Sequence, residues 1–150
     1  MKKQSVLWVL LFICMVNTVE AQQTYDSVLA KKNGADEYGM KQYVMAFLRK
    51  GPADITDKTQ RSELLKGHMQ NIGRLAEAGQ LVLAGPMTAN TGVEGIYVFN
   101  VTTVAEAEAL SLTDPAVKAG LFAMEYHPWY ATAALMEVVR MHGTLQKKKR

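Results

Sequence analysis

Apolar residues in the middle of the chain recur at helical spacing. Steps of four, four and three residues separate Leu64, His68, Ile72 and Leu75. These steps place the four side chains on one face of an amphipathic helix that we predict over 58–78. Gly79 would end this helix in a left-handed cap, and the apolar run 81–84 then predicts a short buried strand. The pattern therefore predicts a helix that packs on a sheet and carries one histidine on its apolar face.

Three further apolar segments predict the rest of the sheet. They are rich in β-branched and aromatic residues and lie at 41–50, 95–101 and 121–130. A second helix is predicted after Thr103, which forms a capping box with Glu106, and Asp114-Pro115 begins one more helical turn. Pro128 indicates that the last strand lies at a sheet edge or ends there. The order strand, helix, strand, strand, helix, strand is that of an α+β, ferredoxin-like βαββαβ domain.

The predicted sheet has more apolar surface than two helices can cover. Helices would pack on one face, and the other face would still expose Met45 or Val44, Tyr97 or Ile96, and Phe122 or Ala123. An uncovered apolar face usually marks an interaction surface. We therefore predict a homodimer in which two sheets pack face to face. A C-terminal helix predicted over 131–142 would follow the last strand.

The N-terminus has the pattern of a secretory signal peptide. Lys2 and Lys3 precede the apolar run 6–16, and Val19-Glu20-Ala21 offers small residues for cleavage before Gln22. The alternative is a membrane anchor, but eleven residues at about 1.5 Å each are too few to cross about 30 Å of hydrocarbon. The sequence thus predicts a secreted or periplasmic protein without a stable membrane span after signal removal.

The 150 residues suggest one domain within four segments. These are the signal peptide 1–21, a lead-in segment 22–40, the domain 41–130, and a C-terminal helix with a basic tail, 131–150. The single cysteine, Cys14, lies in the signal peptide, so the mature chain would hold no disulfide and no cysteine metal site.

The positive charge of the chain lies at its two ends. Without Lys2, Lys3 and the tail 147–150, the 17 basic residues fall to 11, and without Glu20 the 14 acidic residues fall to 13. The body of the protein is therefore slightly acidic, and no nucleic-acid partner is predicted. The tail is expected to be a solvated chain end.

Several motifs occur together between about Lys41 and Trp129. They are Gly-His-Met-Gln-Asn-Ile and Leu-Ala-Glu-Ala-Gly-Gln-Leu-Val-Leu-Ala-Gly-Pro within 67–86, Gly-Ile-Tyr-Val-Phe at 95–99, Ala-Glu-Ala-Glu-Ala-Leu at 105–110, Thr-Asp-Pro-Ala-Val-Lys-Ala-Gly-Leu-Phe at 113–122, and Pro128-Trp129. With these motifs the chain resembles the YCII-related (YciI-like) family of the dimeric α/β-barrel superfamily. The signal peptide, the lead-in, the loop 87–94 and the segment after Tyr130 depart from the family pattern, which suggests an exported branch.

The resemblance implies an active site formed by a helix histidine and the aspartate of an Asp-Pro motif, here His68 and Asp114. It also implies activity on small molecules, since relatives act on hydroxylated or chlorinated aromatic rings and on lactones. An imidazole oriented by a carboxylate can serve as a general base near neutral pH. The resemblance thus predicts a lyase- or isomerase-like enzyme that acts on a small cyclic or aromatic molecule through a His-Asp dyad.

The same residues also permit a structural interpretation. In this alternative Asp114 serves as a helix cap and has no other role, and His68 is a core residue with one hydrogen bond. The protein would then be a non-catalytic small-molecule-binding module or a structural homodimer. His127 shares a strand face with Ala123, Glu125 and Trp129, and this face could line the dimer cavity. Arg49, at the end of the first strand, could face an anionic substrate. No organic cofactor and no metal are predicted, because the sequence contains no dinucleotide, phosphate-loop, zinc or calcium motif.

Overall fold

The computed structural model describes residues 24–89 and 91–147. The predicted signal peptide 1–21, its cleavage point before Gln22, and the last residues of the basic tail, 148–150, lie outside the described residues. Within the described ranges, no helix combines the length and the apolar character needed to cross a membrane.

Helices and strands alternate much as the sequence pattern predicts. In order, the described residues form α2 (Ser27–Asn33), β1 (Met40–Lys50), α3 (Lys58–Glu77), β2 (Leu81–Pro86), β3 (Gly95–Phe99), α4 (Val104–Ser111), α5 (Pro115–Lys118), β4 (Phe122–Thr132), the 3-10 helix η1 (Ala133–Glu137) and α6 (Val138–Leu145). Local signals set these bounds. The Asp57 side chain caps α3 by accepting the amide hydrogen of Gln60 at 2.7 Å, and the predicted capping box of Thr103 and Glu106 begins α4.

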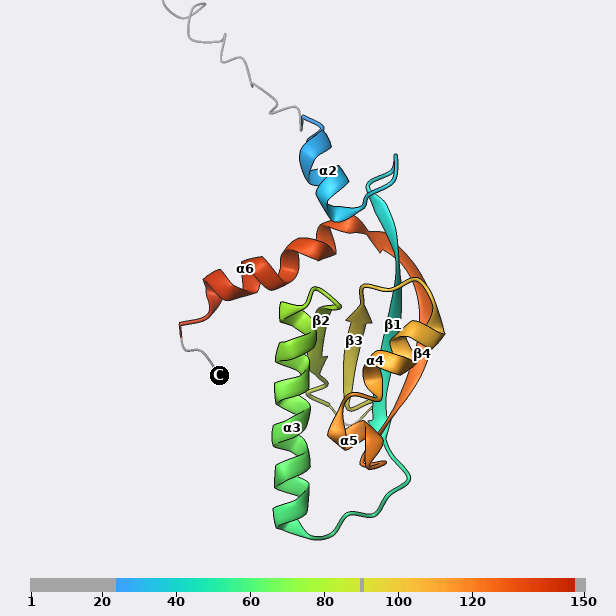
Figure 1. Cartoon of the computed structure of the whole chain (residues 1–150), viewed down its shortest axis with the longest axis vertical. Coiled ribbons are helices and arrows are strands. Elements are labelled where there is room, and N and C mark those ends of the chain that lie inside the picture. The colour runs from blue at the N-terminus through green and yellow to red at the C-terminus, as the bar shows by residue number, and fades with distance from the viewer. Residues whose placement is uncertain (1–23, 90, 148–150) are drawn as a thin grey trace, which may run out of the picture.

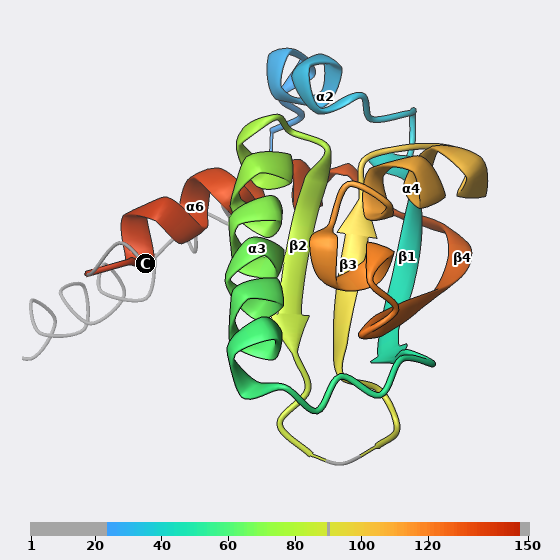
Figure 2. The same cartoon turned by 60° about the horizontal axis from the view of Figure 1, so that its bottom comes forward.

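The four described strands form one antiparallel sheet in the order β2-β3-β1-β4. The central strand β1 pairs with both β3 and β4, so that Met45 lies beside Val98 on one side and His127 on the other. Strand β3 thereby lies between β1 and β2, which is the arrangement of a ferredoxin-like α+β domain. Strand β4 is at the edge, as Pro128 predicts. Helices α3, α4 and α5 lie together on one face of the sheet (Figures 1 and 2).

The main core lies between this sheet face and the helices. Its buried members include Val44 and Leu48 of β1, Phe99 of β3, and Leu75 of α3. Side chains alternate across a strand, so every second residue of β1 points toward the helices. Tyr97 also lies on this face, with 3% of its surface exposed, and is therefore not part of the opposite face. Its position on the helix-covered face allows its hydroxyl to reach His68 of α3.

The opposite sheet face is partly covered by the protein's own C-terminal segment. Tyr43, Val82, Val98 and Ala131 form a second buried cluster, and Leu135 and Met136 pack against it. The prediction of one helix over 131–142 is wrong in its start. Residues 131 and 132 continue β4 because they pair with the first two residues of β1, and the 3-10 helix η1 separates the strand from α6. Figure 2 shows α6 running out beyond the β2 edge.

Hydrophobicity alone does not decide which residues of α3 are buried. Met69 is 49% exposed, whereas the polar residue Asn71 is 7% exposed. Gly67 is a point of close packing, since a Cβ there would lie 2.5 Å from Cγ of Pro115. Gly73 is not, because nothing lies within 4 Å of the corresponding position. Helix α3 therefore approaches α5 closely at the turn that contains Gly67.

Candidate functional site

The site lies where α3 meets the first turn of α5. His68 stands in the middle of α3 on its sheet-facing side, and Asp114 is the N-cap of α5. Pro115 occupies the first turn of α5, where its missing amide hydrogen costs nothing. The absence of a side chain at Gly67 lets Pro115 approach α3, and this brings the neighbouring Asp114 to the histidine.

His68 and Asp114 form a buried hydrogen-bonded pair. Their Nδ1 and Oδ2 atoms lie 2.7 Å apart, although the residues are 46 positions apart in sequence. Their exposed fractions are only 7% and 1%. The other carboxylate oxygen, Oδ1, accepts the backbone amide hydrogens of Ala116 at 2.8 Å and Val117 at 3.4 Å. Asp114 therefore caps α5 with one oxygen and orients the imidazole with the other.

Tyr97 contacts the second nitrogen of the imidazole. Its hydroxyl oxygen lies 3.2 Å from Nε2 of His68. Burial, together with the negative charge of Asp114, raises the pKa of Tyr97, so the phenol keeps its proton. The carboxylate, the imidazole and the phenol can then all form hydrogen bonds at once. In this arrangement His68 donates from Nδ1 to the carboxylate and accepts at Nε2 from the phenol. The lone pair at Nε2 is thus the basic position of the site.

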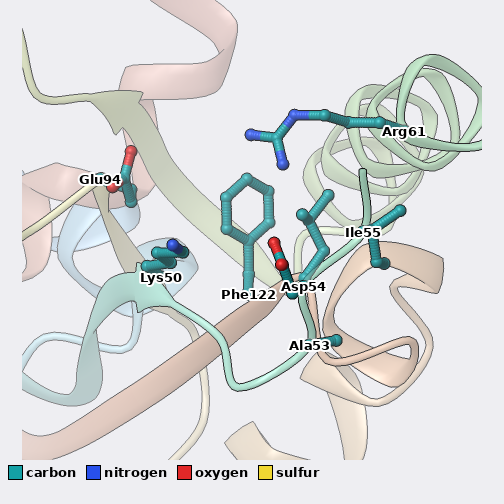
Figure 3. Close-up of a pocket in the computed structure, with 8 residues that line it drawn as sticks. Lys50, Ala53, Asp54, Ile55, Arg61, Glu94 and Phe122 are labelled. Atoms are coloured by element: carbon teal, nitrogen blue, oxygen red, sulfur yellow. The ribbon is translucent and has the colours of Figure 1, made fainter. Parts of the chain in front are cut away.

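A pocket of about 290 Å³ adjoins the imidazole through Phe122. The ring centroids of Phe122 and His68 lie 5.0 Å apart, and Phe122 also lines the pocket. The other lining residues come from the end of β1, the loop after it, the first turn of α3 and the positions just before β3 and β4: Lys50, Ala53, Asp54, Ile55, Arg61, Glu94 and Leu121. Figure 3 shows the ring of Phe122 among these side chains. Phe122 therefore forms a shared wall between the pocket and the imidazole.

The sequence profile of the YCII-related domain matches residues 42–130, which is more than half of the chain. The protein belongs to the YCII-related family. Among solved structures, it is similar to 5-chloro-2-hydroxyhydroquinone dehydrochlorinase from Burkholderia phenoliruptrix AC1100 in complex with 2,5-dihydroxybenzoquinone, with 21% identity and a TM-score of 0.43. The similarity covers 59% of this chain and 93% of that one. A comparison with curated proteins gave no match.

A polar network supports the Asp-Pro turn of the YCII-related domain from outside the pair. The Arg74 guanidinium donates hydrogen bonds of 2.7 Å to both Oδ1 of Asn71 and Oγ1 of Thr113. The Thr113 hydroxyl lies 3.0 Å from the side-chain oxygen Oδ1 of Asn71 and 2.6 Å from the backbone carbonyl oxygen of Leu110. These contacts connect α3 to Thr113, the residue just before Asp114. They therefore help to fix the position of the Asp114 carboxylate along α3.

His127 and Arg49, the two other candidate residues from the sequence, lie away from this site. His127 and Arg49 both bind Glu125, at 2.9 and 2.6 Å, on the sheet face opposite to His68. Because Arg49 pairs with Glu125, its guanidinium binds within the protein and not in the pocket. Across 24–89 and 91–147, no cluster of three or more histidine, cysteine, aspartate or glutamate side chains could hold a metal ion.

Tyr97, Phe122 and Arg61 are the site residues that the sequence pattern does not identify. The alternation of 95–101 places Tyr97 on the same face as Phe99, but it does not say which face meets the helices. Arg61 stands seven residues before His68, or about two helical turns, so it lies on the same side of α3. This spacing is the one sequence signal that could have connected a pocket residue to the histidine.

Proposed function

We propose that this YCII-related protein is a small lyase- or isomerase-like enzyme that acts on a cyclic or aromatic molecule, with His68 as general base and Asp114 as its orienting partner. The observation that carries the proposal is the buried 2.7 Å contact between the imidazole and a carboxylate that two backbone amides hold in place. A base must be positioned before it is useful, and this contact fixes both the ring orientation and the tautomer.

The proposed chemistry begins with proton transfer from a carbon next to a carbonyl group, which includes the keto tautomer of a ring hydroxyl. The C–H bond breaks, the proton moves to Nε2 of His68, and the electron pair moves into an enolate. In a lyase the enolate re-forms its carbonyl, and the electrons expel a leaving group from the adjacent carbon. In an isomerase the imidazolium returns the proton to a different carbon. The Asp114 carboxylate stabilises the positive ring during either sequence.

Substrate access in this proposal depends on Tyr97 and Phe122. The Tyr97 hydroxyl contacts Nε2 at 3.2 Å, and Phe122 lies between the pocket and the imidazole. A substrate that reaches Nε2 replaces the phenol contact and displaces the Phe122 ring. The phenol can then donate its hydrogen bond to the developing enolate oxygen, where a protonated donor is needed. The raised pKa of Tyr97 keeps that donor available.

Carbon–hydrogen exchange tests the proposal without knowledge of the product. The full chain would be incubated in D₂O with a panel of cyclic ketones, lactones and hydroxylated phenols, and exchange followed by proton NMR. We expect catalysed exchange of at least one compound and a loss of about 10²–10⁴-fold in His68→Gln. Asp114→Asn should lower the rate as well, because an amide that donates to Nδ1 moves the ring proton to Nε2.

The matched control is Asp57→Asn, which alters the exposed cap of α3 and leaves the imidazole contact intact. It should exchange substrate at the wild-type rate. Unchanged exchange in His68→Gln, or no exchange of any panel compound by the wild-type protein, contradicts the proposal.

A non-catalytic binding module is the second candidate, and one observation favours it. Both His68 nitrogens already have partners inside the protein, and the ring is 7% exposed, as in a structural core histidine. Such a module binds its ligand equally well after Asp114→Asn and shows no dependence on the imidazole's protonation state. Ligand titrations of this variant between pH 5 and pH 8, set to span the usual histidine range, separate the two candidates.

We also propose that the protein forms a homodimer through the open part of the sheet. The C-terminal segment covers the end of this face near Tyr43, but it leaves Met45, Phe47 and Ile96 half-buried and Leu83 41% exposed. Light scattering coupled to size exclusion should give a dimer mass for the wild type. Ile96→Arg should give a monomer. The control Met141→Arg, on exposed α6, should not change the mass, and an unchanged mass for Ile96→Arg contradicts the proposal.

Export to the periplasm or the medium is the final part of the proposed function. The motivation is the N-terminal pattern of two lysines, an apolar run and Val19-Glu20-Ala21. Mass spectrometry of the full-length gene product recovered from a bacterial host should find Gln22 as the first residue, outside the cytoplasm. Recovery of an intact Met1 in the cytoplasmic fraction would show that the segment is not a cleaved signal.

A further inference from the structure

The pocket beside the imidazole contains charged groups that the protein itself does not pair. Lys50 and Arg61 are its cations, and Asp54 and Glu94 are its anions. In the described part of the chain, none of these four side chains takes part in an ion pair or a side-chain hydrogen bond. The arginines at 49, 74 and 140, in contrast, all bind side-chain oxygens. Arg61 therefore keeps its guanidinium donors free at the pocket.

The position of Arg61 combines this free charge with an aromatic surface. Figure 3 shows its guanidinium reaching from α3 toward the ring of Phe122, with Lys50 and Glu94 across the ring from it. Ala53, Ile55 and Leu121 supply apolar surface in the same pocket. Planar guanidinium groups bind carboxylates and other anionic oxygens through two parallel hydrogen bonds. The pocket thus offers an aromatic wall and one bidentate anion-binding group.

We propose that Arg61 binds an anionic oxygen group of a small ring compound whose ring packs against Phe122. The anionic group is a carboxylate or an ionised ring hydroxyl. The volume of about 290 Å³ is at the small end of ligand sites, which suits a single substituted ring. Asp54 and Glu94 add acceptors for hydroxyl groups of the same ring and repel a second anionic group. The inference rests on the proposed function for the identity of the site and specifies its substrate class.

The distance along α3 allows one molecule to reach both groups after Phe122 moves. Arg61 and His68 are seven residues apart, which corresponds to about 10 Å along a helix axis. An anion held by Arg61 at one edge of a ring directs the opposite edge toward the Phe122 side of the imidazole. Arg61 is therefore a specificity-determining residue in this proposal, and His68 remains the base.

Binding of benzoate tests the inference separately from catalysis. The full chain, labelled at its methyl groups, would be titrated with benzoate and with neutral benzamide, and shifts of Ile55 and Leu121 recorded by NMR. We expect benzoate to move these signals and to bind about tenfold or more tightly than benzamide. Arg61→Gln should lose that preference, and its affinity for benzoate should be lower than that of the wild type by about tenfold or more.

Lys66→Gln is the matched control, because it removes the same charge from an exposed position of α3 outside the pocket. It should bind benzoate like the wild type, which excludes an effect of net charge. Equal benzoate affinity in Arg61→Gln and wild type overturns the inference, as does the absence of saturable shifts in the wild type. His68→Gln should keep benzoate binding while losing carbon–hydrogen exchange. Its exchange result tests the proposed function alone, so the two can fail independently.

Discussion

Replacing Asp114 by alanine should destabilise the fold more than the loss of an ordinary helix cap. The carboxylate is 1% exposed, and it accepts hydrogen bonds from His68 and from two backbone amides of α5. Alanine can accept none of them. The amides at the start of α5 lose their cap, and the Nδ1–H group of a buried imidazole loses its only acceptor among the described residues.

The two losses have separate magnitudes. Removing an N-cap acceptor costs about 0.5–2 kcal/mol. Leaving a buried donor without a partner costs about 1–3 kcal/mol. Asp114→Ala should therefore lower the free energy of unfolding by about 1.5–5 kcal/mol. Asp57→Ala removes only the exposed cap of α3, a single 2.7 Å hydrogen bond to Gln60. It should cost about 1 kcal/mol.

Urea denaturation of both variants at pH 7, followed by circular dichroism, measures the difference. Asp114→Ser gives a finer control, because serine can still cap α5 but is too short to replace the imidazole contact. We expect its stability to lie between that of wild type and Asp114→Ala. If Asp114→Ala proves no less stable than Asp57→Ala, the contact with His68 contributes nothing to stability, and the reasoning about the buried pair is refuted.

Two further predictions concern packing and charge. Gly67→Ala should destabilise the protein by about 1–2 kcal/mol, because the new methyl group clashes with Pro115. Gly73→Ala should stabilise it by up to about 1 kcal/mol, because the helix gains alanine and the position is open. Thermal unfolding measures both variants, and equal effects of the two substitutions would contradict the prediction. The hydrogen bond from Lys32 is the main cause that lowers the pKa of Glu137 from 4.5 to about 2. Stability should therefore fall as pH drops from 4.5 toward 2, and Glu137→Gln should weaken that dependence in urea titrations; equal slopes would contradict it.

Local structure followed closely from the sequence. The spacing of apolar residues and the stop at Gly79 predicted α3 almost to the residue, because helical hydrogen bonds and caps involve positions only three or four apart. The same reason made the capping box of Thr103 and Glu106 and the turn at Asp114-Pro115 predictable. The strands followed from alternation and β-branched composition. The family motifs added the pairing of His68 with Asp114 as an expectation.

Only the tertiary structure decided what these elements do together. The 2.7 Å contact between His68 and Asp114 depends on the close approach of Pro115 to Gly67, which no local pattern encodes. Alternation along β3 leaves two equivalent choices of face, and packing against the helices selects the one that brings Tyr97 to the imidazole. Propensity and periodicity act within a few residues, whereas a site requires groups from distant segments to meet. That meeting is fixed by how the helices cross the sheet.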